Sequence, residues 1–200
     1  MNFLAHLYFA EDTADSRMGS LLGDFVKGQP DSRFSSGTLN GIWLHRAIDN
    51  FTDHHPTVRE TKALISPPRR RFAGIIIDIC YDHFLCQHWN QYSSLTLTDF
   101  SQQTYRSLKS YAGFLPDRVH PIVQKLVAED WLQSYQSVVG IESVLNRVSK
   151  RLRRTNSLYG SVEELIQHYE AFNHQFLVFF PELIQFVHQN PHFFVNVAKS

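Results

Sequence analysis

Hydrophobic residues recur at helical spacing along most of the chain. Apolar side chains return every three or four positions, whereas strict alternation of apolar and polar residues never lasts for the length of a strand. The pattern predicts an all-α protein. The predicted helices cover residues 3–10, 14–27, 38–54, 58–65, 70–91, 99–114, 119–135, 138–154 and 162–189.

Local signals refine these boundaries. Pro121 and Pro181 fall inside two of the predicted helices, where we expect each to cause a break or a kink. Ser161 and Glu164 have the spacing of a capping box at a helix start. The phenylalanines and tyrosines of residues 162–195 are expected to pack in the core rather than to bind a ligand.

Length and composition favour one compact multi-helix domain over residues 1–200. The chain is 43% hydrophobic and contains 16 Phe, which is ample material for a sizeable core. Its 19 basic and 19 acidic residues give a net charge of zero. With no nucleic-acid-binding motif either, we expect no nucleic acid as a partner. Two local basic clusters remain, residues 69–71 and residues 147–154.

The N-terminal residues, the apolar stretches and the cysteines together indicate where in the cell the protein is located. The first residues have no basic region before a long apolar run, so they do not form a secretory signal. No apolar stretch is long enough for a membrane span. The two cysteines, Cys80 and Cys86, cannot form a disulfide framework. We therefore expect a cytoplasmic protein that does not bind membranes.

Acidic residues and histidines gather on segments that otherwise resemble buried helices. His45, Asp49 and Asp53 recur at i, i+4 and i+8, so neighbouring members share a helix face. Asp24 follows two leucines, and Asp78 is surrounded by isoleucines. A carboxylate is rarely buried without a cation or hydrogen-bond donors beside it. Asp82 and His83 lie one turn after Asp78.

This set of oxygen and imidazole ligands predicts a site for Mn²⁺, Mg²⁺ or Fe²⁺ rather than a thiolate zinc site. A bound divalent cation activates water and neutralises phosphoryl oxygens, so phosphoester hydrolysis is the natural reaction class. A plainer alternative stays open, in which Asp49 and Asp53 form a solvated face paired with Arg46 or Arg59. The histidines would then be ordinary core or surface residues.

Four segments in the first 90 residues closely resemble the acyl carrier protein phosphodiesterase family. They read MNFLAHLYFA, GSLLGDFVKG, GIWLHRAIDNFTDHHP and RRRFAGIIIDICYDHFL, in that order. Beyond residue 92 the chain matches only as a helical remainder. The resemblance implies an all-helical fold distantly related to the His-Asp metal-dependent phosphohydrolases, with a Mn²⁺-type cofactor. The usual His-Asp doublet is reversed here, as Asp82-His83, so ligands are not carried over from that superfamily.

The implied reaction removes 4′-phosphopantetheine from holo acyl carrier protein, a function in fatty acid biosynthesis and lipid metabolism. From burial and spacing we predict these metal ligands: His6, Asp24, His45, Asp78 and Asp82. Asp24 is also predicted to be essential for catalysis, and Asp49 and His83 to assist proton transfer. The carrier is an acidic helical protein, so we predict that Lys27 and Arg69, Arg70 and Arg71 bind it, with residues 150–154 as a second docking candidate.

Two alternatives remain at this point. The same ligands could serve a metal-dependent phosphohydrolase acting on a nucleotide or another small molecule. The basic clusters alone could serve a non-catalytic module that binds the carrier, although buried aspartates would then have no explanation. The sequence leaves the oligomeric state and the choice of metal open.

Overall fold

A computed structural model describes residues 1–152 and 156–190, and within these ranges every regular element is a helix. The predicted all-α fold is confirmed. The first helices are α1 (Phe3–Phe9), α2 (Ala14–Leu22), α3 (Ser36–His54), α4 (Pro56–Ala63), the 3₁₀ helix η1 (Pro67–Phe72) and α5 (Ala73–Gln87). They are followed by α6 (Trp89–Tyr92), α7 (Leu97–Ser110), α8 (His120–Ala128), α9 (Trp131–Ser134), α10 (Val138–Arg151), α11 (Val162–Gln167) and α12 (Tyr169–Gln189).

Several predicted helices are shorter than expected or are divided. The segment 119–135 is interrupted at Asp130, whose φ of 47° is in the left-handed region and ends the helical path. The segment 162–189 is divided at His168 into α11 and α12. Pro121 lies in the first turn of α8, where no helical N–H is required. Pro181 does not end α12, which continues through it to Gln189.

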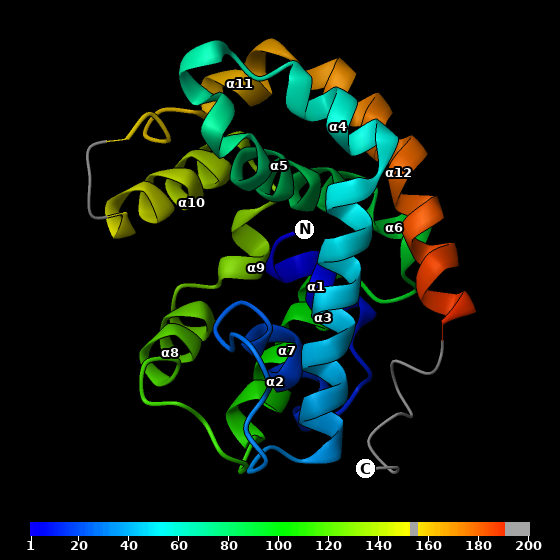
Figure 1. Cartoon of the computed structure of the whole chain (residues 1–200), viewed down its shortest axis with the longest axis vertical. Coiled ribbons are helices and arrows are strands. Elements are labelled where there is room, and N and C mark those ends of the chain that lie inside the picture. Colours follow the sequence, from blue (N-terminus) through cyan, green and yellow to red (C-terminus); the bar gives the residue numbers. More distant parts are fainter. Residues whose placement is uncertain (153–155, 191–200) are drawn as a thin grey trace.

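Helices α2 and α3 pack together at very short distance because glycines face each other across the contact. A Cβ atom on Gly19 would lie 2.2 Å from the carbonyl oxygen of Thr38, and one on Gly41 would lie 2.5 Å from that of Ser16. Figure 1 shows α1 at the centre of the molecule, close to α3 and α5. This arrangement places three helices from the N-terminal half around one point.

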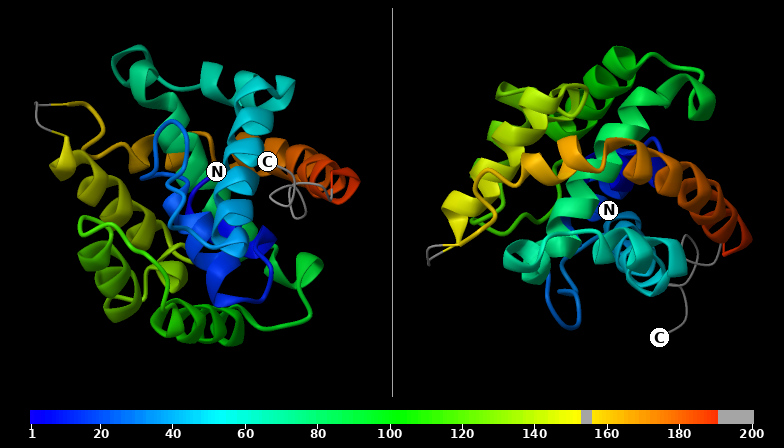
Figure 2. Two further views of the ribbon diagram at one scale, coloured as in Figure 1. Left: turned by 60° about the horizontal axis from the view of Figure 1, so that its bottom comes forward. Right: turned by 90° about the horizontal axis from the view of Figure 1, so that it is seen from above.

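A single connected hydrophobic core supports these helices, and α12 contributes its largest side chains. Phe172, Phe176, Phe179 and Phe180 are fully buried, which confirms for these residues the prediction of core packing, whereas Phe193 and Phe194 lie outside the described residues. Tyr81 of α5 contacts two of these rings edge-on or tilted. Figure 2 shows α12 running along one side of the molecule, where it packs on α3, α4 and α5.

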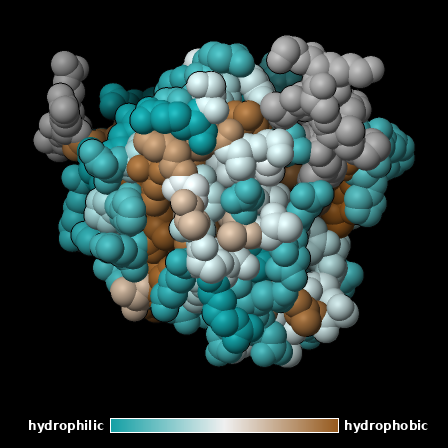
Figure 3. Space-filling view, turned by 90° about the horizontal axis from the view of Figure 1, so that it is seen from below, coloured by the Kyte–Doolittle hydropathy of each residue, from teal (hydrophilic) through white to brown (hydrophobic). Residues whose placement is uncertain are grey.

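The surface is predominantly hydrophilic on the face that Figure 3 shows. Apolar atoms there form one narrow strip and a few isolated spots. Within the described residues, no helix combines the length and the apolar character that crossing a membrane requires.

Candidate functional site

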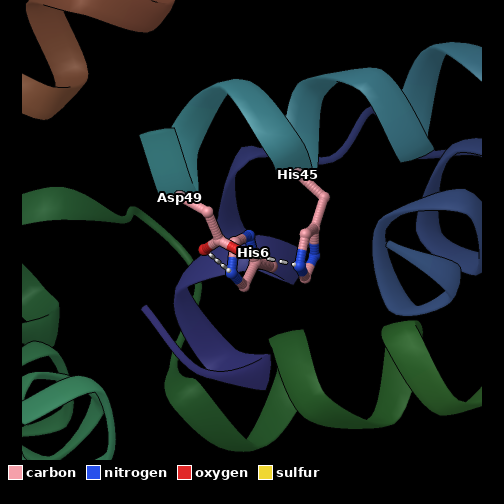
Figure 4. A group of neighbouring side chains, drawn as sticks. All are labelled: His6, His45 and Asp49. Atoms are coloured by element: carbon pink, nitrogen blue, oxygen red, sulfur yellow. Dashed lines mark ion pairs between the residues drawn. The ribbon is translucent and has the colours of Figure 1, made fainter. Parts of the chain in front are cut away.

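Two imidazoles and one carboxylate, from α1 and α3, converge at the centre of the molecule. His6, His45 and Asp49 each offer one ligand-type atom, and these atoms lie within 4.8 Å of one another. Nε2 of His6 is 3.1 Å from Oδ1 of Asp49, and Nε2 of His45 is 3.1 Å from Oδ2 of the same carboxylate. Figure 4 shows the three side chains pointing toward one another. The expected shared face of His45 and Asp49 is thus confirmed.

Ser20 of α2 ties the two histidines together. Its hydroxyl donates a 2.8 Å hydrogen bond to the carbonyl oxygen of His6, and its own carbonyl oxygen accepts a 2.7 Å bond from Nδ1 of His45. Nδ1 of His45 therefore carries hydrogen, and Nε2 faces the carboxylates. The two imidazole rings stack, with centroids 3.7 Å apart. Sequence reasoning did not single out Ser20, because a serine between apolar residues carries no chemical signal of its own.

Asp24 and Asp78 extend this cluster in two different ways. Oδ1 of Asp24 lies 3.6 Å from Nε2 of His45, so this carboxylate borders the cluster directly. Oδ1 of Asp78 lies 3.0 Å from the α-amino group of Met1, which in turn lies 3.7 Å from Oδ1 of Asp49. The positive amine thus links Asp78 to Asp49. The structure brings four of the predicted site residues into one group: His6, Asp24, His45 and Asp49, with Asp78 beside them.

The charges of the cluster are strongly coupled. Burial and the neighbouring His45 lower the pKa of His6 to about 4, so His6 is neutral. His45 is also buried, yet hydrogen bonds to Asp24 and Asp49 outweigh that burial and raise its pKa to about 9. Despite burial, the two imidazoles hold the pKa of Asp49 well below its usual range. One imidazolium therefore balances the carboxylates of this cluster.

Asp82 and His83 lie outside the cluster. The two oxygens of Asp82 accept hydrogen bonds from the backbone N–H groups of Leu4, at 2.8 Å, and Ala5, at 3.3 Å. Asp82 therefore caps the start of α1 and holds the helix that carries His6. His83 is turned to the opposite side, with Nδ1 2.7 Å from the carbonyl oxygen of Tyr135. The geometry gives these two predicted site residues structural roles.

The plainer alternative for α3 fits only its last acidic residue. Asp53 is exposed and forms a 2.8 Å ion pair with Lys62. Arg46, the suggested partner of Asp49, instead donates a 2.7 Å hydrogen bond to the carbonyl oxygen of Val26. Asp49 therefore belongs to the buried cluster, and Asp53 belongs to the solvated face.

Comparison with known proteins shows which family the chain belongs to. The family model described as acyl carrier protein phosphodiesterase matches residues 1–183. The chain belongs to the acyl carrier protein phosphodiesterase family. Three relatives named acyl carrier protein phosphodiesterase come from Enterobacter sp. (strain 638), Klebsiella pneumoniae (strain 342) and Escherichia coli O6:H1. They are 36%, 37% and 37% identical to it, and each alignment covers 92% of this chain and 96% of the relative.

The family match extends far beyond the four N-terminal segments that carried the resemblance. It includes α7 to α11 and most of α12, which the sequence alone related to the family only as a helical remainder. No solved structure matches the chain. The distant relation to His-Asp phosphohydrolases stays a prediction.

The basic residues proposed to bind the carrier in this family member lie in different surroundings. Arg69 is not free to dock a partner, because its guanidinium pairs with Glu163 at 2.9 Å and Glu164 at 3.3 Å. Glu164 also accepts hydrogen bonds from the backbone and hydroxyl of Ser66, so it does not complete the capping box expected with Ser161. Arg69 and Glu164 together attach η1 to α11.

The other proposed carrier-binding residues are exposed. Lys27 lies in the segment that follows α2, and Arg70 and Arg71 lie on η1 rather than on the helix that carries Asp78. The guanidinium of Arg71 rests 4.4 Å from the centroid of the Phe72 ring. Their contact with a carrier stays a prediction.

The basic cluster on α10 is the one that borders the site. A pocket of about 240 Å³ is lined by Asp24, Asp78, Arg147 and Arg151. The sequence showed that residues 147–154 are basic. It could not show that they lie beside the aspartates, because their position depends on how α10 packs on α5. Arg153 and Arg154 lie outside the described residues.

Proposed function

We propose that this protein hydrolyses the phosphodiester bond between 4′-phosphopantetheine and the serine of holo acyl carrier protein, using a divalent cation, Mn²⁺ in the first place. The products are the apo carrier and 4′-phosphopantetheine. The convergence of His6, His45 and Asp49, with Asp24 beside them, is the observation that carries the metal-dependent reaction. The names of the relatives support the choice of substrate.

The donor set fits such a cation. Imidazole nitrogens together with carboxylate oxygens suit Mn²⁺ and Fe²⁺. Asp49 lies 3.1 Å from both Nε2 atoms. Nδ1 of His6 is buried with no hydrogen-bond partner in the described part of the chain. His6, His45, Asp49 and Asp24 would hold the cation.

The chain's own groups prepare the reaction around that centre. A bound divalent cation supplies positive charge for a phosphate oxygen and lowers the pKa of water. Ser20 fixes the ring of His45, and Asp82 fixes the helix that presents His6. The leaving serine oxygen needs a proton. The carboxyl of Asp78 lines the pocket beside the centre, so it is placed to assist this proton transfer.

A pair of substitutions on α3 tests this function. Asp49→Asn should lower both the bound Mn²⁺, measured by elemental analysis, and turnover of holo carrier by more than about 100-fold, because ligands contribute at least as much as the groups that orient them. Asp53→Asn is the matched control, since Asp53 is one turn away and pairs with Lys62 on the surface. Equal metal content and turnover in both variants would contradict the proposed centre.

The position of bond cleavage is tested with isotopic water. Hydrolysis in H₂¹⁸O should place the label on the released phosphopantetheine, because water attacks phosphorus. Label in the serine of the carrier would show attack at carbon and reject this mechanism.

A further inference from the structure

A groove with two chemically different walls lies next to the candidate metal centre, between α5 and α10. One end of the groove is polar and consists of the α-amino group of Met1 with Asp24 and Asp78. From there the groove continues over apolar side chains. Its volume is about 240 Å³.

The apolar wall is built by both helices. Ile75 and Ile79 project from α5, and Val144 and Val148 project from α10. Ile75 is 36% exposed although α5 is otherwise largely buried. An exposed isoleucine beside a polar cluster offers contact to an uncharged part of a ligand. The wall therefore suits the methyl and methylene groups of an uncharged chain.

Two arginines of α10 complete the groove around Trp131. The guanidinium carbons of Arg147 and Arg151 lie 4.2 Å and 5.4 Å from the centroid of the indole ring. Glu129 approaches Arg147 at 3.5 Å, and its carboxylate is about half exposed. On α10, two neighbouring guanidiniums face one exposed carboxylate, so this part of the wall is positive although Asp24 and Asp78 also line the groove. Such a pair recognises a phosphate, which accepts hydrogen bonds from both groups.

We propose that this groove binds the phosphopantetheine part of the substrate. The phosphate lies between the candidate metal centre and the arginine pair, and the uncharged pantetheine chain lies along the wall formed by Ile75, Ile79 and Val148. This inference rests on the proposed function and adds the position of the arm. The arginine pair complements the charge of the phosphate, and the apolar wall contacts the uncharged chain.

The first test fills the groove. Ile75→Trp adds a large ring at the exposed edge of the apolar wall, so it should weaken binding of free 4′-phosphopantetheine at least about 10-fold in isothermal titration calorimetry. It should also raise the KM for holo carrier by a similar factor. Ile166→Trp is the control, because Ile166 is an exposed isoleucine of α11 that does not line the groove. Circular dichroism confirms that both variants fold.

The second test removes one charge at the wall. Arg151→Ala should weaken binding of 4′-phosphopantetheine about 10-fold but leave binding of pantetheine, which lacks the phosphate, unchanged. Lys150→Ala removes the same charge one position earlier on α10, from an exposed residue outside the groove, and should change neither. The difference between these neighbours separates contact with phosphate from a general effect of surface charge.

The outcomes distinguish the groove from the reaction itself. If the wild-type protein hydrolyses holo carrier and Ile75→Trp does so with unchanged KM and unchanged binding of 4′-phosphopantetheine, the arm lies elsewhere and the inference is wrong. If the wild-type protein binds 4′-phosphopantetheine in the groove but does not hydrolyse holo carrier with Mn²⁺, the proposed function fails while the subsite stands. Failure of the wild-type protein to bind 4′-phosphopantetheine at all overturns the subsite.

Discussion

Replacing Gly23 by alanine should disrupt the candidate metal centre, because the added methyl group would displace the imidazole of His45. Gly23 ends α2 with φ of −51° and ψ of −39°, a backbone conformation that alanine adopts without strain. A Cβ atom at this position, however, would lie 2.2 Å from Cγ and 2.4 Å from Cδ2 of His45. The imidazole has to move, although it is stacked on His6 and bonded to Ser20.

The opposing free energies can be compared. Alanine in place of glycine in helical backbone stabilises by about 0.5–1 kcal/mol. Forcing a methyl group into a packed site costs about 1–3 kcal/mol. Loss of the hydrogen bond between His45 and Ser20 costs about 1 kcal/mol more. Gly23→Ala should therefore lower the free energy of unfolding by about 1–3 kcal/mol and displace His45 from the cluster.

Two assays check this expectation against a matched glycine. Urea denaturation gives the free energy of unfolding, and calorimetric titration gives the affinity for Mn²⁺, which should fall more than about 10-fold. Gly74→Ala is the control, because a Cβ atom on Gly74 would meet nothing closer than 3.9 Å, at Cε of Lys62. Gly74→Ala should keep the metal affinity and lose no stability. Wild-type stability and Mn²⁺ affinity in Gly23→Ala would refute the position assigned to His45.

Three further predictions follow from contacts outside the cluster. Arg69→Ala should lower the free energy of unfolding by about 2–3 kcal/mol, because it leaves the buried carboxylate of Glu164 without its guanidinium. The KM for holo carrier should not change. A raised KM with unchanged stability would instead support a role of Arg69 in docking. Burial raises the pKa of Asp82 from 3.8 to about 7, so its contribution to stability is complete below about pH 4 and is lost as the pH rises to about 7. The loss is on the order of 4 kcal/mol, and urea titrations of Asp82→Asn between pH 4 and 7 should show a flatter profile than the wild type. Removing metal with a chelator should lower the Tm and Mn²⁺ should restore it, whereas an identical melt with and without metal would show that no cation stabilises the fold.

The sequence predicted correctly which side chains meet where both lie on one helix. His45 and Asp49 are one turn apart, and a regular helix places such residues on the same face. His6 comes from α1 and Asp24 from the turn after α2, and both were predicted because a histidine and an aspartate interrupt apolar segments. Their convergence depends on the close packing of α2 on α3 at Gly19 and Gly41, which spacing alone does not show.

For α5, spacing did not show which neighbouring elements surround each side chain. Asp78 and Asp82 share a face as predicted, but α1 lies across that face. The free backbone N–H groups at the start of α1 donate hydrogen bonds to the carboxylate of Asp82. His83 follows Asp82 in the chain, yet one residue turns a helix by about 100°, so its side chain leaves toward Tyr135 and Tyr169. Proximity in sequence is therefore a poor guide to a shared site within a helix.

Long helical segments were located correctly, but their subdivisions were not. The hydrophobic period continues through Asp130 and His168, although the backbone leaves the helix there. Asp130 adopts a positive φ although it is not glycine, so the sequence contains no glycine that would indicate a turn at this position. The placement of Arg147 and Arg151 beside the aspartates likewise follows from the packing of α10 on α5, which has no local signal.

The most direct test of the central claim is the mass of holo acyl carrier protein after incubation with this protein and Mn²⁺. We predict that the mass falls to that of the apo carrier, that free 4′-phosphopantetheine appears in equal amount, and that a chelator or Asp49→Asn prevents both changes. A holo carrier whose mass stays constant with the metal-loaded wild-type protein would contradict the claim.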